Sequence, residues 1–270
     1  MTQTLFDRHA LDLHRTRAKG ATFLHEAAAV ELSERLQEVN RTFTNAVFIG
    51  PEAELWSRIT GIDGRCIADD ATLDLQVGEC DLIVHGLALH WAEDPVGQLV
   101  QMRRALRPDG MMVAALFGGQ TLHELRAAFG AAEIAVEGGL SPRVAPMGEI
   151  RDLGALLQRA QLALPVADSL DLTVDYADPL ALCRDLRAMG ETNAVAARRR
   201  SFLRRETLMQ AMAHYAAHFG RPDGRIEATF EIVFLTGWAP AASQQQPLRP
   251  GSAKTRLADA LRVPERRAED

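Results

Sequence analysis

Apolar residues fill several short, unbroken stretches of the chain, and longer amphipathic stretches lie between them. The runs at residues 46–49, 80–89 and 111–117 are almost wholly apolar. Such runs are typical of parallel strands that are buried on both faces of a sheet. Residues 64–70 predict a shorter strand. Residues 169–176 alternate apolar and polar side chains, as does the start of a predicted closing strand further on, so both read as late strands.

In the intervening stretches, apolar residues recur every three or four positions, which predicts amphipathic helices. The predicted helices cover residues 23–36, 51–60, 95–107, 121–134, 148–162, 178–190 and 204–219. The third is the best delimited, since Asp94 is a candidate N-cap, Pro95 fits a first helical turn, and Gly110 belongs to a turn that follows the helix. Strand, helix and strand over residues 80–117 form a βαβ unit, which implies a parallel sheet with a right-handed crossover.

These patterns divide the chain into three parts. Residues 1–40 are predicted to be an N-terminal helical segment, and residues 41–240 an α/β domain. Residues 241–270 are polar and contain prolines, which predicts a disordered tail.

Composition limits the classes of function. The 270 residues carry 30 Lys and Arg against 36 Asp and Glu, for a net charge of −6, so the whole-chain charge does not favour nucleic acid binding. The N-terminal residues lack the apolar core of a signal peptide, and no apolar run reaches the roughly 20 residues that span a bilayer. We therefore expect a cytoplasmic protein with at most a peripheral membrane contact.

The sequence offers no recognisable metal or nucleophile motif. The three cysteines are scattered without a C-x-x-C pair, which fits a reducing compartment. His123 and Glu124 resemble the start of a zinc motif, but Ala127 stands where the second histidine belongs. None of the eight histidines has an acid two residues later, so the usual iron-binding triad is not apparent. No G-x-S-x-G elbow or P-loop occurs.

The stretch "DLIVHGLALHWAEDPVGQLVQMRRALRPDG" resembles the fourth strand, following helix and fifth strand of class I S-adenosylmethionine methyltransferases. This resemblance implies a three-layer, Rossmann-like α/β fold with a shortened N-terminal half and helical insertions after strand five. The segments "EGGLSPRVAPMGEIRDLGALLQRA" and "LRAMGETNA" are similar to one branch, the bacterial relatives of the mitochondrial complex I assembly factor that hydroxylates an arginine. The malonyl-carrier methyltransferases of biotin synthesis are a neighbouring branch.

One stretch departs from the family pattern. After the first strand, Gly50 is followed by Pro51, Glu52, Ala53 and Glu54 instead of further glycines. Glycines there let the backbone approach a cofactor closely, so we expect S-adenosylmethionine to bind weakly or not at all. Between Gly50 and Asp81 lie 81 − 50 − 1 = 30 residues, about the length of one βαβ unit. At least one element of the expected succession is therefore shortened or missing.

The resemblance also implies functional residues. The implied cofactor-binding residues are Gly50, Asp69, Asp70, Gly86 and Leu87. His90 is the catalytic candidate, because it follows the fourth strand at the edge where α/β sheets bind ligands. The implied substrate-side residues are Trp91, Arg143, Glu191 and Asn193.

Each candidate also has a purely structural interpretation. Asp69 and Asp70 also fit a solvated turn, and Gly50 also fits a strand end that eases the chain into a helix. His90 and Trp91 also fit a cap that packs on the next helix. The arginines of residues 198–205 form either a solvated helix start or a patch for an acidic partner or a membrane surface.

Three functions remain open at the level of sequence. The first is an assembly factor for the respiratory NADH–quinone oxidoreductase, which would modify an arginine on its protein partner, the quinone-site subunit. The second is an S-adenosylmethionine-dependent methyltransferase of a small or carrier-bound acid. The third is a non-catalytic scaffold that has lost cofactor binding.

Overall fold

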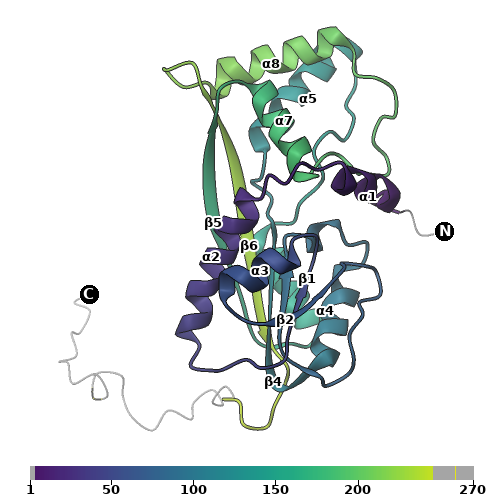
Figure 1. The fold of residues 1–270 in the computed structure, drawn as a ribbon. Helices are drawn as coiled ribbons and strands as arrows, with labels where there is room; N and C mark the ends of the chain where they lie inside the picture. The colour runs from purple at the N-terminus through teal and green to yellow at the C-terminus, as the bar shows by residue number, and fades with distance from the viewer. Residues whose placement is uncertain (1–3, 246–258, 260–270) are drawn as a thin grey trace, which may run out of the picture. The chain divides into compact units, whose positions relative to one another are not determined.

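The computed structural model describes residues 4–245 and 259. One sheet of six strands runs through the fold in the order β2-β1-β3-β4-β6-β5 (Figure 1). The strands are β1 (Ala46–Ile49), β2 (Gly64–Ile67), β3 (Cys80–Gly86), β4 (Leu106–Phe117), β5 (Ala163–Tyr176) and β6 (Ile226–Trp238). The first four strands are parallel, whereas β6 runs antiparallel to both β4 and β5.

Eight α-helices and one 3₁₀ turn connect these strands within the described residues. They are α1 (Arg8–Thr16), α2 (Phe23–Glu38), α3 (Ala53–Thr60), η1 (Leu89–Trp91), α4 (Pro95–Ala105), α5 (His123–Glu137), α6 (Ile150–Arg159), α7 (Pro179–Met189) and α8 (Arg205–Phe219). The predicted cap of α4 is present, because the Asp94 carboxylate accepts a hydrogen bond from the Gly97 N–H and Pro95 opens the helix.

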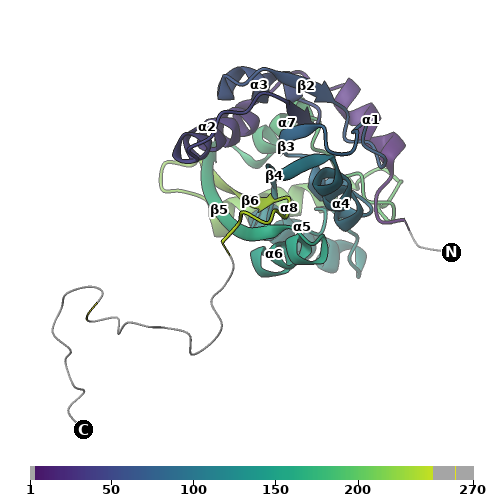
Figure 2. The same ribbon diagram turned by 90° about the horizontal axis from the view of Figure 1, so that it is seen from below.

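Two helical layers cover the sheet (Figure 2). Helices α2 and α3 lie on one face, where Phe48, Val84 and Phe234 belong to one buried apolar cluster. Helices α4 and α6 lie on the other face, where the alternate residues Ile49 and Ile83 belong to a second cluster. Since successive strand residues point to opposite faces, unbroken apolar runs produce these two cores. The three-layer α/β fold is confirmed.

A separate group of helices stands beyond the carboxyl ends of the parallel strands. Figure 1 shows α5, α7 and α8 together at that end, with α1 beside them. The long antiparallel arms of β5 and β6 extend to this group, and Tyr215 of α8 donates a hydrogen bond to the Glu227 carbonyl of β6. Helices α5, α7 and α8 therefore form a roof over the sheet edge.

The predicted shortening of the N-terminal half is confirmed and can be located. The strand predicted as the fourth is the third in the chain, because residues 68–79 contain neither helix nor strand. One strand and its helix are thus missing between β2 and β3. As a result, β2 is an edge strand, paired with β1 on one side only.

Strand β3 ends earlier than its apolar run suggests. The prediction that it reaches Leu89 is wrong, since pairing with β4 stops at Gly86. Leu87 has φ of 45°, in the left-handed region, and its N–H donates to the Ala115 carbonyl at 2.9 Å. The chain turns there into η1, so the apolar residues that follow are buried without being part of the strand.

The N-terminal helix is attached to the sheet edge. Phe6 packs edge-to-face on Trp91 with ring centroids 5.2 Å apart, and its N–H donates to Glu93 at 2.6 Å. The described residues up to Pro240 form one compact unit. The disorder predicted for residues 241–270 falls largely outside the described residues.

Candidate functional site

The loop after β1 lies at the carboxyl edge of the sheet, where ligands of open α/β folds bind. Gly50 has φ of 129°, and its N–H donates to the Ile67 carbonyl at 3.1 Å. A Cβ atom at Gly50 would lie 2.7 Å from the carbonyl oxygen of Gly86. Glycine is therefore required here because the ends of β1 and β3 approach closely.

A hollow of about 540 Å³ lies beside this loop, with α1 as its other wall. Its charged lining residues are Arg8, Asp12, Arg15, Glu52, Glu54 and Asp69. Carboxylates thus outnumber guanidinium groups four to two. Burial and the neighbouring Glu54 charge raise the pKa of Glu52. The hollow has the position expected for a cofactor at this sheet edge, but its lining is acidic.

Asp69 is held by the N-terminal helix. Its carboxylate is 5% exposed and accepts hydrogen bonds from Arg8 at 3.1 and 3.2 Å and from Arg15 at 2.8 and 3.0 Å. Burial opposes its ionisation, but the charge of Arg15 and the hydrogen bond from Arg8 outweigh burial and lower its pKa. Asp70 is exposed, 3.7 Å from Arg8. Both oxygens of Asp69 are therefore already used within the chain.

Two other residues expected to bind the cofactor, Gly86 and Leu87, instead have roles in packing and in the path of the chain. A Cβ atom at Gly86 would lie 2.6 Å from the Trp56 indole, so glycine is needed for α3 to pack on β3. Leu87 is fully buried and redirects the chain after the strand. Neither residue lines the hollow, whereas Gly50 and Asp69 do.

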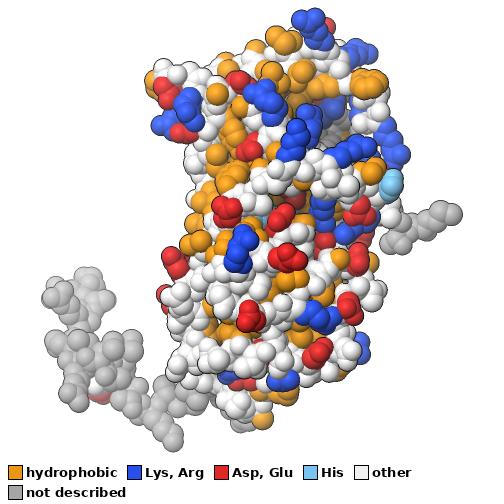
Figure 3. All heavy atoms as spheres, viewed as in Figure 1, with side chains coloured by type: hydrophobic (Ala, Val, Ile, Leu, Met, Phe, Trp, Pro, Cys, Tyr) orange, Lys and Arg blue, Asp and Glu red, His pale blue; other side chains and the backbone are white. Residues whose placement is uncertain are grey.

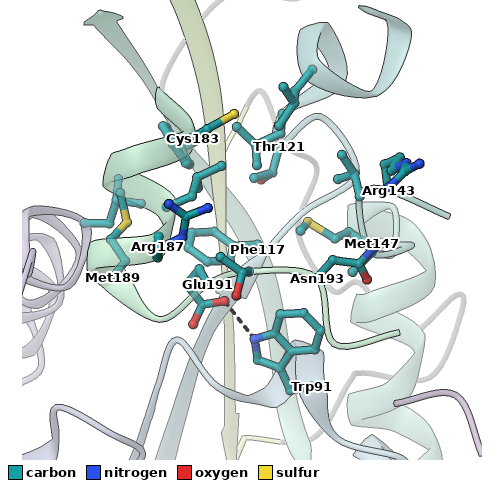
Figure 4. A pocket seen from close by; sticks show the side chains of 18 residues that line it. Trp91, Phe117, Thr121, Arg143, Met147, Cys183, Arg187, Met189, Glu191 and Asn193 are labelled. Atoms are coloured by element: carbon teal, nitrogen blue, oxygen red, sulfur yellow. Dashed lines mark hydrogen bonds between the residues drawn. The ribbon is translucent and has the colours of Figure 1, made fainter. Parts of the chain in front are cut away.

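A second, apolar cavity of about 220 Å³ lies under the roof helices (Figure 4). Its walls come from η1, β4, α5, α7 and the loops around residues 143–147 and 191–193. The side chains labelled in Figure 4 are Trp91, Phe117, Thr121, Arg143, Met147, Cys183, Arg187, Met189, Glu191 and Asn193. Glu191 is the only carboxylate among the lining residues.

The carboxylate of Glu191 has two partners. Trp91 Nε1 donates to Glu191 Oε2 at 2.8 Å, and His90 Nε2 lies 3.4 Å from the same oxygen. Glu191 Oε1 carries no hydrogen bond from the described residues and remains an acceptor. Burial opposes ionisation, but the hydrogen bond and charge of His90 and the charge of Arg15 hold the pKa of Glu191 below its usual value. An ionised carboxylate thus stands at the wall of an apolar cavity.

His90 lies behind this carboxylate. Its side chain is 3% exposed, and its ring packs on Phe117 with centroids 4.8 Å apart. It does not line the cavity itself, and its Nδ1 has no partner among the described residues. His90 therefore acts on the cavity only through Glu191. It orients the Glu191 carboxylate and helps to keep it ionised.

Arg143 and Asn193 line the cavity but are engaged by the loop that closes it. Arg143 Nε donates to Glu133 Oε1 at 2.7 Å, and Glu133 also accepts from Ser141. Asn193 Nδ2 donates to the Pro142 carbonyl at 2.6 Å. The sequence-predicted substrate-side residues therefore do come together, and two of them fix the loop of residues 138–147.

Sequence reasoning missed the partners that hold these groups. Arg8 and Arg15 are seven residues apart, two helical turns, so they share a face of α1 and reach Asp69 together. That spacing was visible in the sequence, but no pattern identified Asp69 as the target. Glu133 lies within a helix that could be predicted, yet its bond to Arg143 depends on a loop without periodicity.

Two kinds of site receive no support from the described part of the chain. Residues 4–245 and 259 contain no group of three or more His, Cys, Asp or Glu side chains placed to hold a metal ion. No helix in that part combines the length and apolar character required for a membrane span.

Comparisons with known proteins agree with the fold. Residues 16–114 match the family model of the methyltransferase domain. The crystal structure of the YcgJ protein from Bacillus subtilis superposes with a TM-score of 0.50 and 14% identity, over 80% of this chain and all of that one. The family match, the fold and the relatives described next show a protein of the class I S-adenosylmethionine methyltransferase superfamily.

Sequence similarity identifies a narrower family. The chain is 33% identical over 266 residues to the mitochondrial arginine hydroxylase NDUFAF5 of Danio rerio, covering 89% of this chain and 83% of that protein. The chain belongs to the family of this arginine hydroxylase. It is also 35% identical over 183 residues to a malonyl-[acyl-carrier protein] O-methyltransferase of Halorhodospira halophila, covering 67% of this chain and 60% of that protein. Matches to four other NDUFAF5 proteins span only 41% to 57% of their length.

Proposed function

We propose that this protein takes part in assembling the respiratory NADH–quinone oxidoreductase by modifying an arginine side chain of a partner, the quinone-site subunit. The observation that carries the proposal is the Glu191 carboxylate at the wall of the apolar cavity. A guanidinium group binds a carboxylate through planar, charge-assisted hydrogen bonds. Family membership, through a relative named as an arginine hydroxylase, supports the same substrate.

The cavity suits an arginine side chain in two further respects. The indole of Trp91 lies next to Glu191 (Figure 4), and a guanidinium gains cation–π attraction over an aromatic face. Met147 and Leu125 supply apolar contact for the methylene stem. The free Oε1 of Glu191 is the acceptor that an incoming N–H requires.

S-adenosylmethionine is the cofactor that the superfamily implies, and the sheet-edge hollow is where it would lie. The residues present do not form the usual cradle, because Glu52 and Glu54 follow Gly50 and the Asp69 oxygens are bridged by arginines. The proposed recognition of arginine rests on the cavity and not on this hollow. A scaffold without catalysis is the second candidate, and the bridged Asp69 favours it.

The test is the Glu191→Gln variant, expressed in a strain that lacks the native gene. Glutamine retains an acceptor for the Trp91 N–H but removes the charge, so we expect at least a tenfold loss of arginine modification, measured by mass spectrometry of the quinone-site subunit. Glu38→Gln, at the exposed end of α2, is the matched control and should behave as wild type.

Two results would count against the proposal. Full modification with Glu191→Gln, at unchanged protein levels, would remove the carboxylate from substrate recognition. An arginine that is unmodified even in the wild-type strain, together with impaired oxidoreductase assembly in the deletion strain, would favour the scaffold.

A further inference from the structure

A second charged surface lies next to the cavity, where the end of α1 meets α7. The Lys19 N–H donates to the Ala188 carbonyl at 2.8 Å, which fixes the chain after α1 to the end of α7. A hollow of about 590 Å³ opens there. We call it the basic groove, and its four cationic residues are Arg17, Lys19, Arg184 and Arg187. Figure 3 shows basic side chains gathered over this part of the face.

The positive charge of the basic groove is not compensated within the described chain. Arg17, Lys19 and Arg187 form no ion pair with a carboxylate of the described residues, and Arg184 lies 3.9 Å from an exposed Asp178. Asp185 is the one carboxylate of the lining, and it accepts the Tyr176 hydroxyl at 2.8 Å. Three cations therefore have no ion-pair partner from the described residues, and the fourth has one at 3.9 Å.

The arginine-rich stretch that the sequence suggested as a partner surface is different. Arg198 and Arg200 pair with Asp7 at 2.8 and 3.3 Å, and Arg199 pairs with Glu137. These arginines fasten the segment after Asn193 to α1 and α5. Much of their charge is thus satisfied internally, which makes the basic groove the stronger candidate for a partner.

The basic groove and the apolar cavity share one lining residue. Arg187 lines both, and Figure 4 shows it on the same side of the cavity as Glu191. A segment that places one side chain in the cavity therefore lies beside Arg187, the residue that belongs also to the basic groove.

The apolar residues of the basic groove help to decide whether a membrane or a charged peptide binds there. Tyr176 is buried, and the other apolar lining residues are Ala181 and Ala188. No large apolar side chain of this lining is exposed, so the lining itself offers no anchor for insertion into a bilayer. A concave, basic surface without such anchors fits a narrow, negatively charged chain.

We propose that the basic groove binds an acidic segment of the protein partner, adjacent to the side chain that enters the cavity. The assignment of that partner rests on the proposed function, whereas the affinity for acidic peptide does not. Carboxylates of the segment lie against Lys19, Arg184 and Arg187, and this attraction weakens with salt.

The binding test uses the full-length protein and a fluorescein-labelled hexaglutamate peptide, followed by anisotropy at low and high salt. The Lys19→Glu/Arg184→Glu variant reverses two groove charges without touching the cavity lining. We expect at least a tenfold loss of affinity and a weaker salt dependence. Arg151→Glu/Arg159→Glu, on the exposed surface of α6, is the matched control and should bind as wild type.

The second measurement separates the groove from the cavity. With the quinone-site subunit as substrate, Lys19→Glu/Arg184→Glu should raise KM with little change in kcat, because binding is lost but the cavity is intact. Equal peptide binding by this variant and its control would overturn the groove proposal. So would binding to phosphatidylglycerol vesicles without binding to the peptide. A normal Glu191→Gln variant alongside a defective groove variant would defeat the proposed function alone.

Discussion

Two buried histidines show how single residues tie the stability of the fold to pH. His25 Nδ1 accepts a hydrogen bond from Trp56 Nε1 at 3.0 Å, and His85 Nε2 lies 3.0 Å from Gln98 Oε1. Burial lowers the pKa of each imidazole from 6.5 to about 4. Both rings are therefore neutral in the folded protein under conditions where an exposed histidine gains a proton.

The free energy of unfolding should fall as the pH is lowered from 6.5 to 4. In that window the unfolded chain binds one more proton per histidine than the folded chain, so each imidazole contributes a slope of about 1.4 kcal/mol per pH unit. His25→Gln retains an acceptor for Trp56 but cannot titrate. Urea unfolding should show a slope for this variant that is about 1.4 kcal/mol per pH unit smaller than that of wild type.

The control is His9→Gln, at an exposed position of α1, which should leave the slope unchanged. A His25→Gln slope equal to that of wild type would show that His25 is protonated in the folded state.

At the scale of elements, the periodicity of apolar residues predicted the positions of helices and strands better than it predicted the contacts between them. β1 was predicted to the residue, and α4 was predicted from its cap, because both depend on local patterns. The end of β3 was not, since the reversal at Leu87 uses a left-handed conformation that an apolar run does not reveal. The role of Asp69 was also hidden, because its partners lie more than 50 residues earlier.

The loop between β1 and α3 should make S-adenosylmethionine a weak ligand. Glu52 and Glu54 would face the carboxylate of its methionine part, and like charges near a protein surface cost on the order of 1 kcal/mol or more. Calorimetry of the purified protein should therefore detect no micromolar binding. Glu52→Gln/Glu54→Gln should bind about fivefold or more tightly than wild type.

Glu206→Gln, at an exposed position of α8, removes charge away from the hollow and should not alter this affinity. Micromolar binding by the wild-type protein would show that the acidic loop moves aside or is protonated when the ligand binds.

At the scale of the whole molecule, the sheet is shortened beside the hollow, whereas helices α5, α7 and α8 are present over the sheet edge. One strand and helix are missing on the side of the hollow, whereas α5, α7 and their loops enclose a cavity with an ionised carboxylate. Chemistry on a partner's side chain fits this division better than turnover of a small molecule. The resemblance of the sequence to known families predicted the superfamily and the segments that form the roof. It did not predict the cavity, because the cavity forms only where residues 91, 117, 147 and 191 come together in space.

Deleting the gene should lower the amount of assembled NADH–quinone oxidoreductase and leave biotin-independent growth unchanged. The reason is that the proposed substrate is a protein side chain and not a carrier-bound acid. Native gel electrophoresis and growth without biotin measure the two effects. A biotin requirement with normal oxidoreductase would assign the protein to the malonyl-carrier branch instead.

The lost strand also affects how the protein behaves in a crowded solution. It leaves β2 as an open border of the sheet, and unpaired backbone groups on such a border recruit strands of other chains. This border is only four residues long and includes Arg65, which bonds to Asp74 at 2.8 Å. The opposite border, β5, includes Pro165 beside a register shift and an exposed Asp171. Short length and charge oppose intermolecular strand pairing at β2, whereas at the 14-residue β5 only the proline, the register shift and the charged Asp171 do so.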